Sequence, residues 1–230
     1  MDKIVLKSLV FIKLKEMLRK RLVISVLALV FSIQLFSQDT VKVFVALWDS
    51  PPESDLYWGM KYGMKTYFSK DADWEVVRKV KPGVKIKEQI IFFNKNLNLY
   101  VDAMAYNADS IKTAITEFIE YTYNADTNKL VIYVGHDGLM DFDVEVVPQK
   151  NKCDVMVFSC ISDYYFSPFV DMCLSTYTLM APEAYVVMAA IESWAANDSE
   201  KEIRKNTAKV YAKYQKSTII QAEVTFLPED

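Results

Sequence analysis

The chain has 230 residues, with 27 Lys and Arg against 30 Asp and Glu, a single His, three Cys and five Gly. One His excludes a three-His zinc site and the His-Glu-x-x-His helix of metalloproteases, and the absence of Cys-x-x-Cys excludes zinc ribbons and thioredoxin-type redox pairs. The sequence also lacks a glycine-rich phosphate loop and a Gly-x-Ser-x-Gly nucleophile motif. We therefore expect no metal site and no cofactor.

The first 38 residues have the pattern of a secretory signal peptide. Basic residues at 19–21 precede the apolar run LVISVLALVFSIQLF at 22–36, and polar residues follow. This order is typical of export signals, and we expect cleavage near Ser37 or Gln38. The alternative is a membrane anchor, for which the apolar run is short because a span needs about 20 residues. Translation could also start at Met17, which would make residues 1–16 an over-extended gene start.

Removal of this segment changes the charge of the protein. The mature chain keeps 20 of the 27 basic residues and 28 of the 30 acidic ones, which gives a net charge of −8. A protein that binds nucleic acid needs a basic face, so we expect no nucleic-acid partner. We expect an exported protein, periplasmic or secreted, with no stable membrane insertion of the mature chain. The sequence leaves the oligomeric state open.

The first half of the mature chain alternates predicted strands and helices. β-branched and aromatic residues predict strands at 40–47, 74–80, 86–93 and 99–106. A Met-rich and aromatic segment predicts a helix at 56–68. The clearest helix is predicted at 109–124, because its apolar residues form one stripe and Asp109 can cap its first turn.

The second half continues the alternation and adds helices near its end. Buried strands are predicted at 130–134 and 154–159, joined by a charged connection that could include a short strand at 144–147. Helices are predicted at 164–173, 182–195 and 199–216, and a terminal edge strand at 219–226. Such alternation is typical of an α/β sandwich with a mostly parallel sheet, here in one domain at 39–230.

Two of the predicted buried strands end in residues that can carry chemistry. His136 follows the strand at 130–134, and Cys160 follows the strand at 154–159. Active groups gather at the carboxyl ends of parallel strands, so both side chains would share one edge of the sheet if the strands are parallel and close. A thiol and an imidazole there supply a nucleophile and a general acid or base. We expect the other two cysteines, Cys153 and Cys173, to be structural.

These two segments resemble the histidine and cysteine blocks of the caspase-like cysteine peptidases, which include caspases, metacaspases, gingipains and clostripain. Residues 133–138, Tyr-Val-Gly-His-Asp-Gly, are similar to an apolar strand that ends in His-Gly, and residues 154–160 are similar to the strand that ends in Cys. The resemblance implies a three-layer α/β/α sandwich, with Cys160 as the acyl-forming nucleophile and His136 as its proton-transfer partner. It also implies that the backbone amides of Gly138 and Cys160 hold the oxyanion.

One residue departs from the family pattern. Asp137 separates His136 from Gly138, where the family has His followed directly by Gly. Asp137, Asp163 and Tyr164 are candidates for shaping a substrate pocket beside the two catalytic candidates.

The sequence is consistent with three functions. The first is an exported cysteine peptidase or acyl hydrolase that acts on a peptide or protein substrate. The second is an inactive member of the same fold that serves as a binding module, which the additional Asp137 favours. The third is a metal-dependent hydrolase that uses the acidic residues at 137–145.

Overall fold

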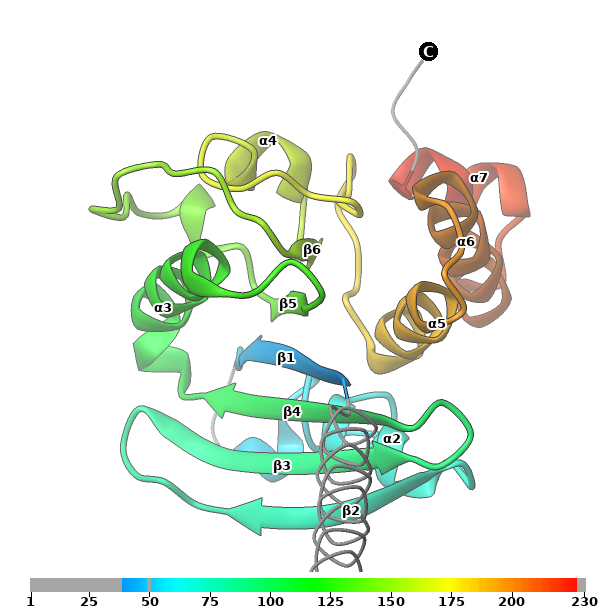
Figure 1. The fold of residues 1–230 in the computed structure, drawn as a ribbon, viewed down its shortest axis with the longest axis horizontal. Coiled ribbons are helices and arrows are strands. Elements are labelled where there is room, and N and C mark those ends of the chain that lie inside the picture. The colour runs from blue at the N-terminus through cyan, green and yellow to red at the C-terminus, as the bar shows by residue number, and fades with distance from the viewer. Residues whose placement is uncertain (1–38, 49–50, 227–230) are drawn as a thin grey trace, which may run out of the picture. The chain divides into compact units, whose positions relative to one another are not determined.

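A six-stranded mixed sheet lies at the centre of the computed structural model, which describes residues 39–48 and 51–226 (Figure 1). The strands run in the order β2-β3-β4-β1-β5-β6. Their bounds are β1 (Asp39–Ala46), β2 (Trp74–Val80), β3 (Ile86–Asn94), β4 (Leu99–Tyr106), β5 (Leu130–Gly135) and β6 (Asp154–Phe158). Strands β4, β1, β5 and β6 are parallel to one another, whereas β2, β3 and β4 pair in antiparallel fashion. The predicted α/β class and the mostly parallel sheet are confirmed.

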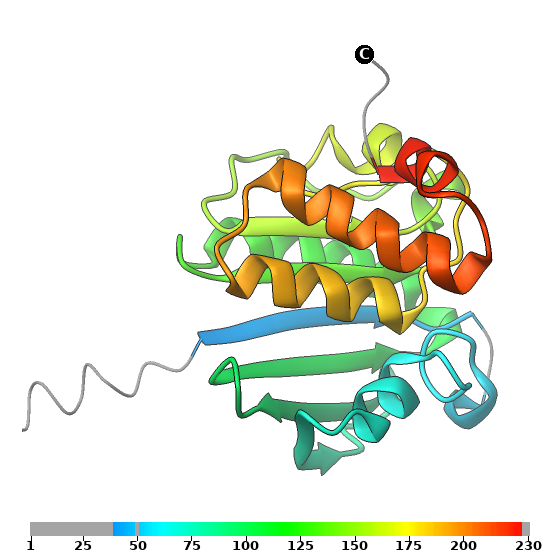
Figure 2. The ribbon, with the colours of Figure 1, turned by 90° about the vertical axis from the view of Figure 1, so that its right-hand side faces the viewer.

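Helices cover both faces of this sheet (Figures 1 and 2). On one face lie α3 (Ile111–Asn124) and the short α4 (Ser162–Phe166). On the other lie α2 (Met64–Lys70) and α5 (Ala184–Ala195), and α6 (Glu200–Gln215) and α7 (Ile219–Phe226) follow α5. Three single 3₁₀ turns, η1 (Pro52–Ser54), η2 (Ala108–Ser110) and η3 (Gly138–Met140), lie in the connections.

The central strands are buried on both faces. In β1, Val43 and Val45 belong to the core under α5, whereas Phe44 and Ala46 belong to the core under α3. Every residue of β5 is buried in the same way. Strands of this kind appear in the sequence as continuous apolar runs, which explains why these two strands could be located from the sequence alone.

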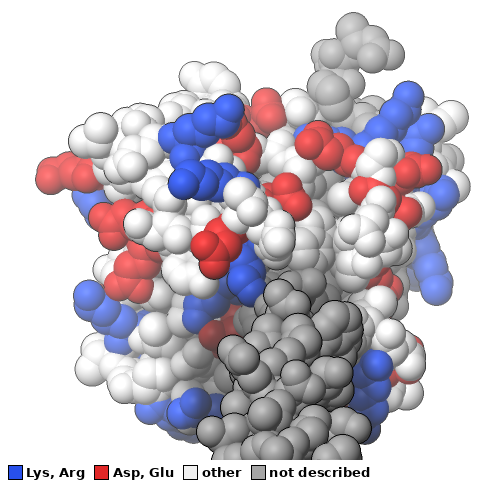
Figure 3. Space-filling model, in the orientation of Figure 1, with Lys and Arg blue, Asp and Glu red and all other residues white. Residues whose placement is uncertain are grey.

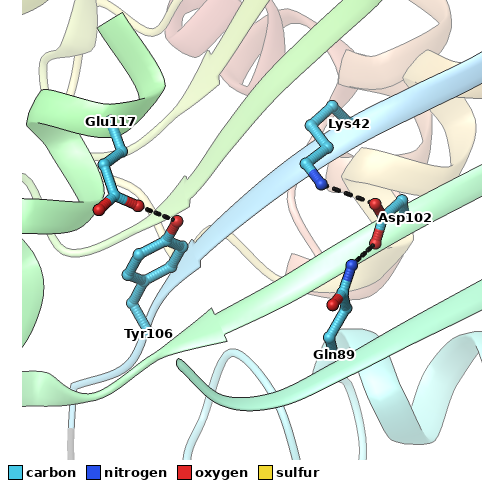
Figure 4. A network of polar contacts seen from close by, with 5 residues as sticks. All are labelled: Lys42, Gln89, Asp102, Tyr106 and Glu117. Carbon is cyan, nitrogen blue, oxygen red and sulfur yellow. Dashed lines mark hydrogen bonds and ion pairs between the residues drawn. The ribbon is translucent and has the colours of Figure 1, made fainter. Parts of the chain in front are cut away.

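A row of polar side chains crosses β3, β4 and β1 (Figure 4). Lys42 Nζ on β1 lies 2.6 Å from Asp102 Oδ2 on the directly opposite position of β4. The other oxygen of Asp102 accepts a hydrogen bond from Gln89 Nε2 on β3 at 2.7 Å. Farther along β4, the Tyr106 hydroxyl donates to Glu117 of α3 at 2.6 Å. A register shift would separate these partners, so the row supports the observed pairing.

The prediction of a terminal edge strand at 219–226 is wrong, because this segment is helix α7. The Gln221 backbone N–H donates to Thr218 Oγ1 at 3.2 Å, and the Thr218 backbone N–H donates to Gln221 Oε1 at 3.0 Å. These two bonds form a capping box, which starts a helix. Ala222 and Phe226 are then buried in the core that α6 shares, so capping and packing outweigh the β-propensity of the isoleucines.

Other boundaries also differ from the predictions. The helix predicted at 56–68 begins only at Met64, and turns occupy 56–62. A Cβ at Gly63 would lie 2.4 Å from the Trp58 carbonyl carbon, so the chain folds back too closely for a regular helix. The helix predicted at 164–173 ends at Phe166, and residues 144–147 form no strand. Asp109, which was expected to cap the helix at 109–124, lies inside η2 and does not cap α3.

A buried carboxylate holds the 56–62 turns against the sheet. Glu88 of β3 is 1% exposed, and its Oε2 accepts from Trp58 Nε1 at 2.6 Å and lies 3.0 Å from Lys65 Nζ. Its Oε1 lies 2.8 Å from Lys79 Nζ. Burial by itself raises the pKa of Glu88, but the two ammonium groups and the indole N–H outweigh burial and hold this pKa below its ordinary value.

The signal peptide predicted at 1–38 lies outside the described residues. Among the residues described, no helix combines the length and apolar character that a membrane span requires. On the face seen in Figure 3, basic and acidic side chains are interspersed, without a continuous basic surface.

Replacement of Glu88 by Gln tests the role of this carboxylate. We expect E88Q to lower the free energy of unfolding by about 1–3 kcal/mol, because two ammonium groups lose their buried partner. Urea denaturation at pH 7 measures the change. The control is E75Q, because Glu75 pairs with Lys95 at the surface at 2.7 Å and should contribute less than about 1 kcal/mol. Equal effects of the two substitutions would contradict the assigned role.

Candidate functional site

The candidate site lies at the carboxyl ends of β5 and β6. These two strands are parallel neighbours, and their last register pair is Val134 with Phe158. His136 and Cys160 each lie two residues beyond this pair, on strands that are about 4.8 Å apart. Strands β5 and β6 lie side by side (Figure 1). Both residues therefore leave the sheet at the same edge, as the sequence predicts for parallel and adjacent strands.

The turn that follows Cys160 is strained. Ile161 has φ 49° and ψ 38°, the left-handed conformation, which is rare for a β-branched residue. Hydrogen bonds hold it there: the Ile161 N–H donates to the Thr178 carbonyl at 3.0 Å, and the Ser162 and Thr176 hydroxyls are 2.9 Å apart. Strain of this kind persists only where the surroundings enforce it and is common at functional sites.

The Cys160 thiol is partly buried on the α5 and α6 side of the edge. Its Sγ donates to the Met180 carbonyl at 3.5 Å. Tyr57 lies near it: burial, and after burial the negative charge of a Cys160 thiolate, raise the pKa of Tyr57 to about 12. Burial raises the pKa of Tyr211 of α6, and the charges of Glu183 and then of the same thiolate raise it further in smaller part.

The other two cysteines have different environments. Cys153 and Cys173 are buried, and their thiols donate to backbone carbonyls at 3.5 and 3.2 Å. Burial raises their pKa values to about 11 and about 12. All three cysteines are free, so Cys160 combines a free thiol with partial exposure.

The His136 ring lies in the wall of an open hollow of about 490 Å³. Its Nε2 is 2.8 Å from Asp141 Oδ2, and the Trp48 ring packs edge-on against it with 4.7 Å between centroids. The hollow is lined by Trp48, Ala108, Asp109, Ile111, Lys112, His136, Asp141 and Phe142. Among the interactions of the described residues, no hydrogen bond joins the His136 ring to the Cys160 sulfur. The two side chains share an edge but contact different neighbours.

One buried carboxylate links the neighbours of both side chains. Asp55 is 1% exposed and accepts a hydrogen bond from the Trp48 N–H at 2.7 Å through one oxygen. Its other oxygen accepts from the Tyr57 N–H at 2.8 Å. Asp55 thus holds the residue that packs on His136 and the residue that lies near Cys160.

Asp137 is fully buried in the turn that follows β5. Its Oδ1 accepts from the Leu139 N–H at 3.1 Å and caps η3. Burial raises its pKa to about 7, although the Leu139 N–H, His136 and the Ser159 hydroxyl each lower it in part. Because the side chain has no exposure to solvent, it does not line the open hollow, and Asp141 does so instead.

Two glycines shape the same turn. Gly135 has φ 135°, and a Cβ there would lie 2.3 Å from the Ala46 carbonyl oxygen. A Cβ at Gly138 would lie 2.4 Å from the Phe142 ring. The Gly138 N–H donates to the His136 carbonyl at 3.2 Å, so this predicted oxyanion donor closes a turn in the structure.

The two pocket candidates after Cys160 have different environments. Asp163 of α4 accepts a hydrogen bond from the hydroxyl of Ser175, which lies in the segment that follows α4, at 2.9 Å. Tyr164 is 72% exposed, and its ring packs edge-on against Tyr165.

Trp48 and Tyr57 were not predicted from the sequence. The sequence did contain a signal for Trp48, because this residue follows the predicted strand at 40–47. Active groups gather at the carboxyl ends of parallel strands, and this applies to that strand as well. Tyr57 had no comparable signal, because its position depends on how the 56–62 turns fold back.

Within the described part of the chain, no three His, Cys, Asp or Glu side chains come together as a metal site. This also applies to the acidic residues at 137–145. No family model, curated protein or solved structure matches the chain.

Replacement of Asp137 by Asn tests whether ionisation of this buried carboxyl destabilises the folded protein. In the unfolded chain this carboxyl ionises near pH 4, and in the folded chain near pH 7. The folded state therefore holds the proton more tightly, and the stability of the wild type falls as the pH rises between these values. We expect D137N to be more stable than the wild type by about 2–4 kcal/mol at pH 8, with little difference at pH 4.

Chemical denaturation at both pH values measures this difference. The control is D143N, because Asp143 is exposed in the same connection and should leave the pH dependence unchanged. If D137N were no more stable than the wild type at pH 8, ionisation of the Asp137 carboxyl would not destabilise the folded state, and the prediction would be wrong.

Proposed function

We propose that the chain is an exported cysteine peptidase or acyl hydrolase with a caspase-like three-layer α/β/α architecture, in which Cys160 is the nucleophile and His136 transfers protons. One observation carries the proposal: β5 and β6 are parallel and adjacent, and they bring the only histidine of the chain and a partly exposed cysteine to one edge. Helices on both faces and the strained turn after Cys160 support it. The substrate would be a peptide or protein.

The reaction would proceed in two steps. In the first, His136 accepts the thiol proton, Cys160 Sγ bonds to the substrate carbonyl carbon, and the C–N bond breaks as the leaving amine receives the proton from His136. In the second, a water oxygen bonds to the same carbon, its proton passes through His136, and the thioester C–S bond breaks to restore the thiol. The products are an amine and a carboxylic acid.

The surroundings support these roles in part. The bond from His136 Nε2 to Asp141 would orient the ring and leave Nδ1 for proton transfer, although Asp141 is 63% exposed and the pair is worth little as a salt bridge. The Cys160 backbone N–H is one candidate for the oxyanion. Gly138 would have to release the His136 carbonyl before its N–H could serve as the second.

Alkylation of the full-length chain tests the nucleophile. We expect iodoacetamide at pH 8 to modify Cys160 at least about tenfold faster than Cys153 or Cys173, because burial raises the pKa values of the other two thiols. Mass spectrometry of peptides after timed quenching locates the label. H136A should slow the labelling of Cys160 and leave the other two sites unchanged. Equal rates at all three cysteines in the folded protein would exclude Cys160 as an activated nucleophile.

A library of fluorogenic peptides tests turnover directly. We expect C160A to abolish cleavage and H136A to reduce kcat by about 10²–10⁴-fold, the usual contribution of a general acid or base. C153A is the matched control, because it removes a buried thiol on the α3 side and should retain activity. Cleavage that persists in C160A would assign the activity to other residues.

The second candidate function is a binding module without catalysis. The observation that favours it is that the Cys160 sulfur bonds to the Met180 carbonyl and the His136 ring to Asp141, with no bond between the two. A wild-type protein with no turnover on the peptide library, and with unchanged partner binding after H136A substitution, would support this candidate.

A further inference from the structure

The hairpin formed by β2 and β3 concentrates positive charge on an acidic protein. Residues 78–87 hold five basic residues and no acidic one, whereas the rest of residues 39–230 hold 15 basic and 28 acidic residues. The fold uses one of the five, because Lys79 pairs with the buried Glu88. The other four form no ion pair among the described residues, and we refer to them as the basic cluster: Arg78, Lys81, Lys85 and Lys87.

The basic cluster is accessible. Arg78, Lys81 and Lys85 are exposed, and Lys87 is half-buried. Like charges at such short spacing repel one another, and the described part of the chain offers them no carboxylate partner. A negatively charged ligand would therefore be attracted to this surface.

Strand β2 is an open edge of the sheet (Figure 1). Among the described strands it pairs with β3 alone, so the backbone groups on its other side can pair with an added strand. Val76 and Val77 in this strand are 45% and 53% exposed. Lysines on an edge strand hinder pairing with uncharged strands, but opposite charges on adjacent strands attract. The edge therefore favours an acidic strand.

The turn between β2 and β3 lies at the same sheet edge as the candidate site. β3 begins level with the end of β4, and β1 and β5 end at this level as well. The Asn107 N–H donates to the Lys85 carbonyl at 2.7 Å, and the next residue, Ala108, lines the hollow beside His136. β3 and β5 are three strand spacings apart, or about 14 Å. A segment bound at the turn thus lies close to the candidate site.

Two lysines of the basic cluster line a second hollow beside this turn. It measures about 260 Å³, and its lining residues are Pro52, Glu53, Lys81, Gly83, Lys87 and Glu88. The charge of Glu88 is already balanced by Lys65 and Lys79, so Glu53 is the lining acid that remains against two lysines. A carboxylate side chain that enters this hollow would meet a net positive charge.

We propose that the β2 edge and the basic cluster bind an acidic, extended segment of a partner protein, which adds to the sheet beside β2 and places its carboxylates at the lysines of the turn. In strand addition the backbone hydrogen bonds give affinity and the side chains give specificity. The inference goes beyond the proposed function and does not require catalysis, because it applies to a peptidase and to a binding module alike.

Other occupants fit this surface less well. Val84 is 80% exposed at the turn, but attachment to a lipid surface needs a larger apolar area than one valine. A second copy of the chain also offers acidic residues, but a contact between its acidic surface and this hairpin would be head-to-tail and would not form a closed dimer.

Fluorescence anisotropy with a labelled acidic peptide tests the proposal. The probe is Glu-Thr-Glu-Val-Glu-Thr-Glu with an N-terminal fluorescein, and its matched control has Gln at each Glu position. The protein is full-length C160A, in which the proposed nucleophile cannot consume the probe. We expect the acidic peptide to bind and the Gln peptide not to bind, and we expect added salt to weaken binding.

Substitution of the lysines locates the binding surface. We expect K81Q/K85Q/K87Q to raise the Kd of the acidic peptide at least about fivefold, because three exposed charge pairs are lost. Lys79 is kept, so Glu88 retains its ion pair. The matched control is K201Q/K205Q/K209Q, which removes three lysines of α6 that also form no ion pair among the described residues. Circular dichroism shows that each variant is folded.

Hydrogen exchange tests the addition of a strand. We expect a saturating concentration of the acidic peptide to slow amide exchange within residues 74–80, because the outer backbone groups of β2 then form hydrogen bonds. Equal binding of the acidic and Gln peptides, an equal loss of affinity in the α6 variant, or binding without protection of β2 would overturn the proposal.

Three further measurements test the other occupants. These are cosedimentation with phosphatidylglycerol vesicles, binding of a deoxythymidine decamer, and self-association of the chain by analytical ultracentrifugation. Tighter binding of vesicles or of the decamer than of the acidic peptide, or self-association that K81Q/K85Q/K87Q abolishes, would assign the surface to that occupant and overturn the proposal. Loss of peptide cleavage in C160A tests the proposed function separately, so the two failures are distinguishable.

Discussion

The parallel pairing of β5 with β6 is the constraint on which the site depends. Both strands are almost entirely buried, and their register pairs Leu130 through Val134 with Asp154 through Phe158. Because side chains alternate between two packed faces, a slip of one residue would place core residues of each strand on the wrong face. The register therefore fixes where each strand ends and, with it, the common edge at which His136 and Cys160 leave the sheet.

The strongly packed strands allow less favourable local structure at their ends. Ile161 adopts a left-handed conformation, which costs of the order of 1–3 kcal/mol for a non-glycine residue, and Asp137 buries a carboxyl whose ionisation is penalised. The bonds of Ser162 with Thr176 and of Asp137 with Leu139 hold these residues in place. At this edge of the sheet the unfavourable features thus lie in the two turns, whereas the β5–β6 pairing itself has no register shift.

The sequence predicted what depends on local pattern. Continuous apolar runs located β1, β5 and β6, and Ser199-x-x-Glu202 correctly predicted the capping box of α6. The same rule applied to Thr218-x-x-Gln221 would have predicted α7, but the isoleucines after Thr218 favoured a strand. The neighbours of the candidate site depend on tertiary folding: Tyr57 lies near Cys160 only because Glu88 and Asp55 hold the 56–62 turns. The spacing of residues in the sequence does not indicate how these turns fold back, so it could not predict that Tyr57 lies near Cys160.

Asp137 shows why an acidic residue beside a candidate site needs a structure for its interpretation. From the sequence, an acid between His136 and Gly138 was a candidate for a pocket wall and an argument for lost activity. The structure places its side chain inside the protein, where it caps η3 and faces Ser159. The turn keeps both of its glycines in positions that a side chain would obstruct. Asp137 therefore caps the turn that follows His136 and does not line the hollow beside the His136 ring.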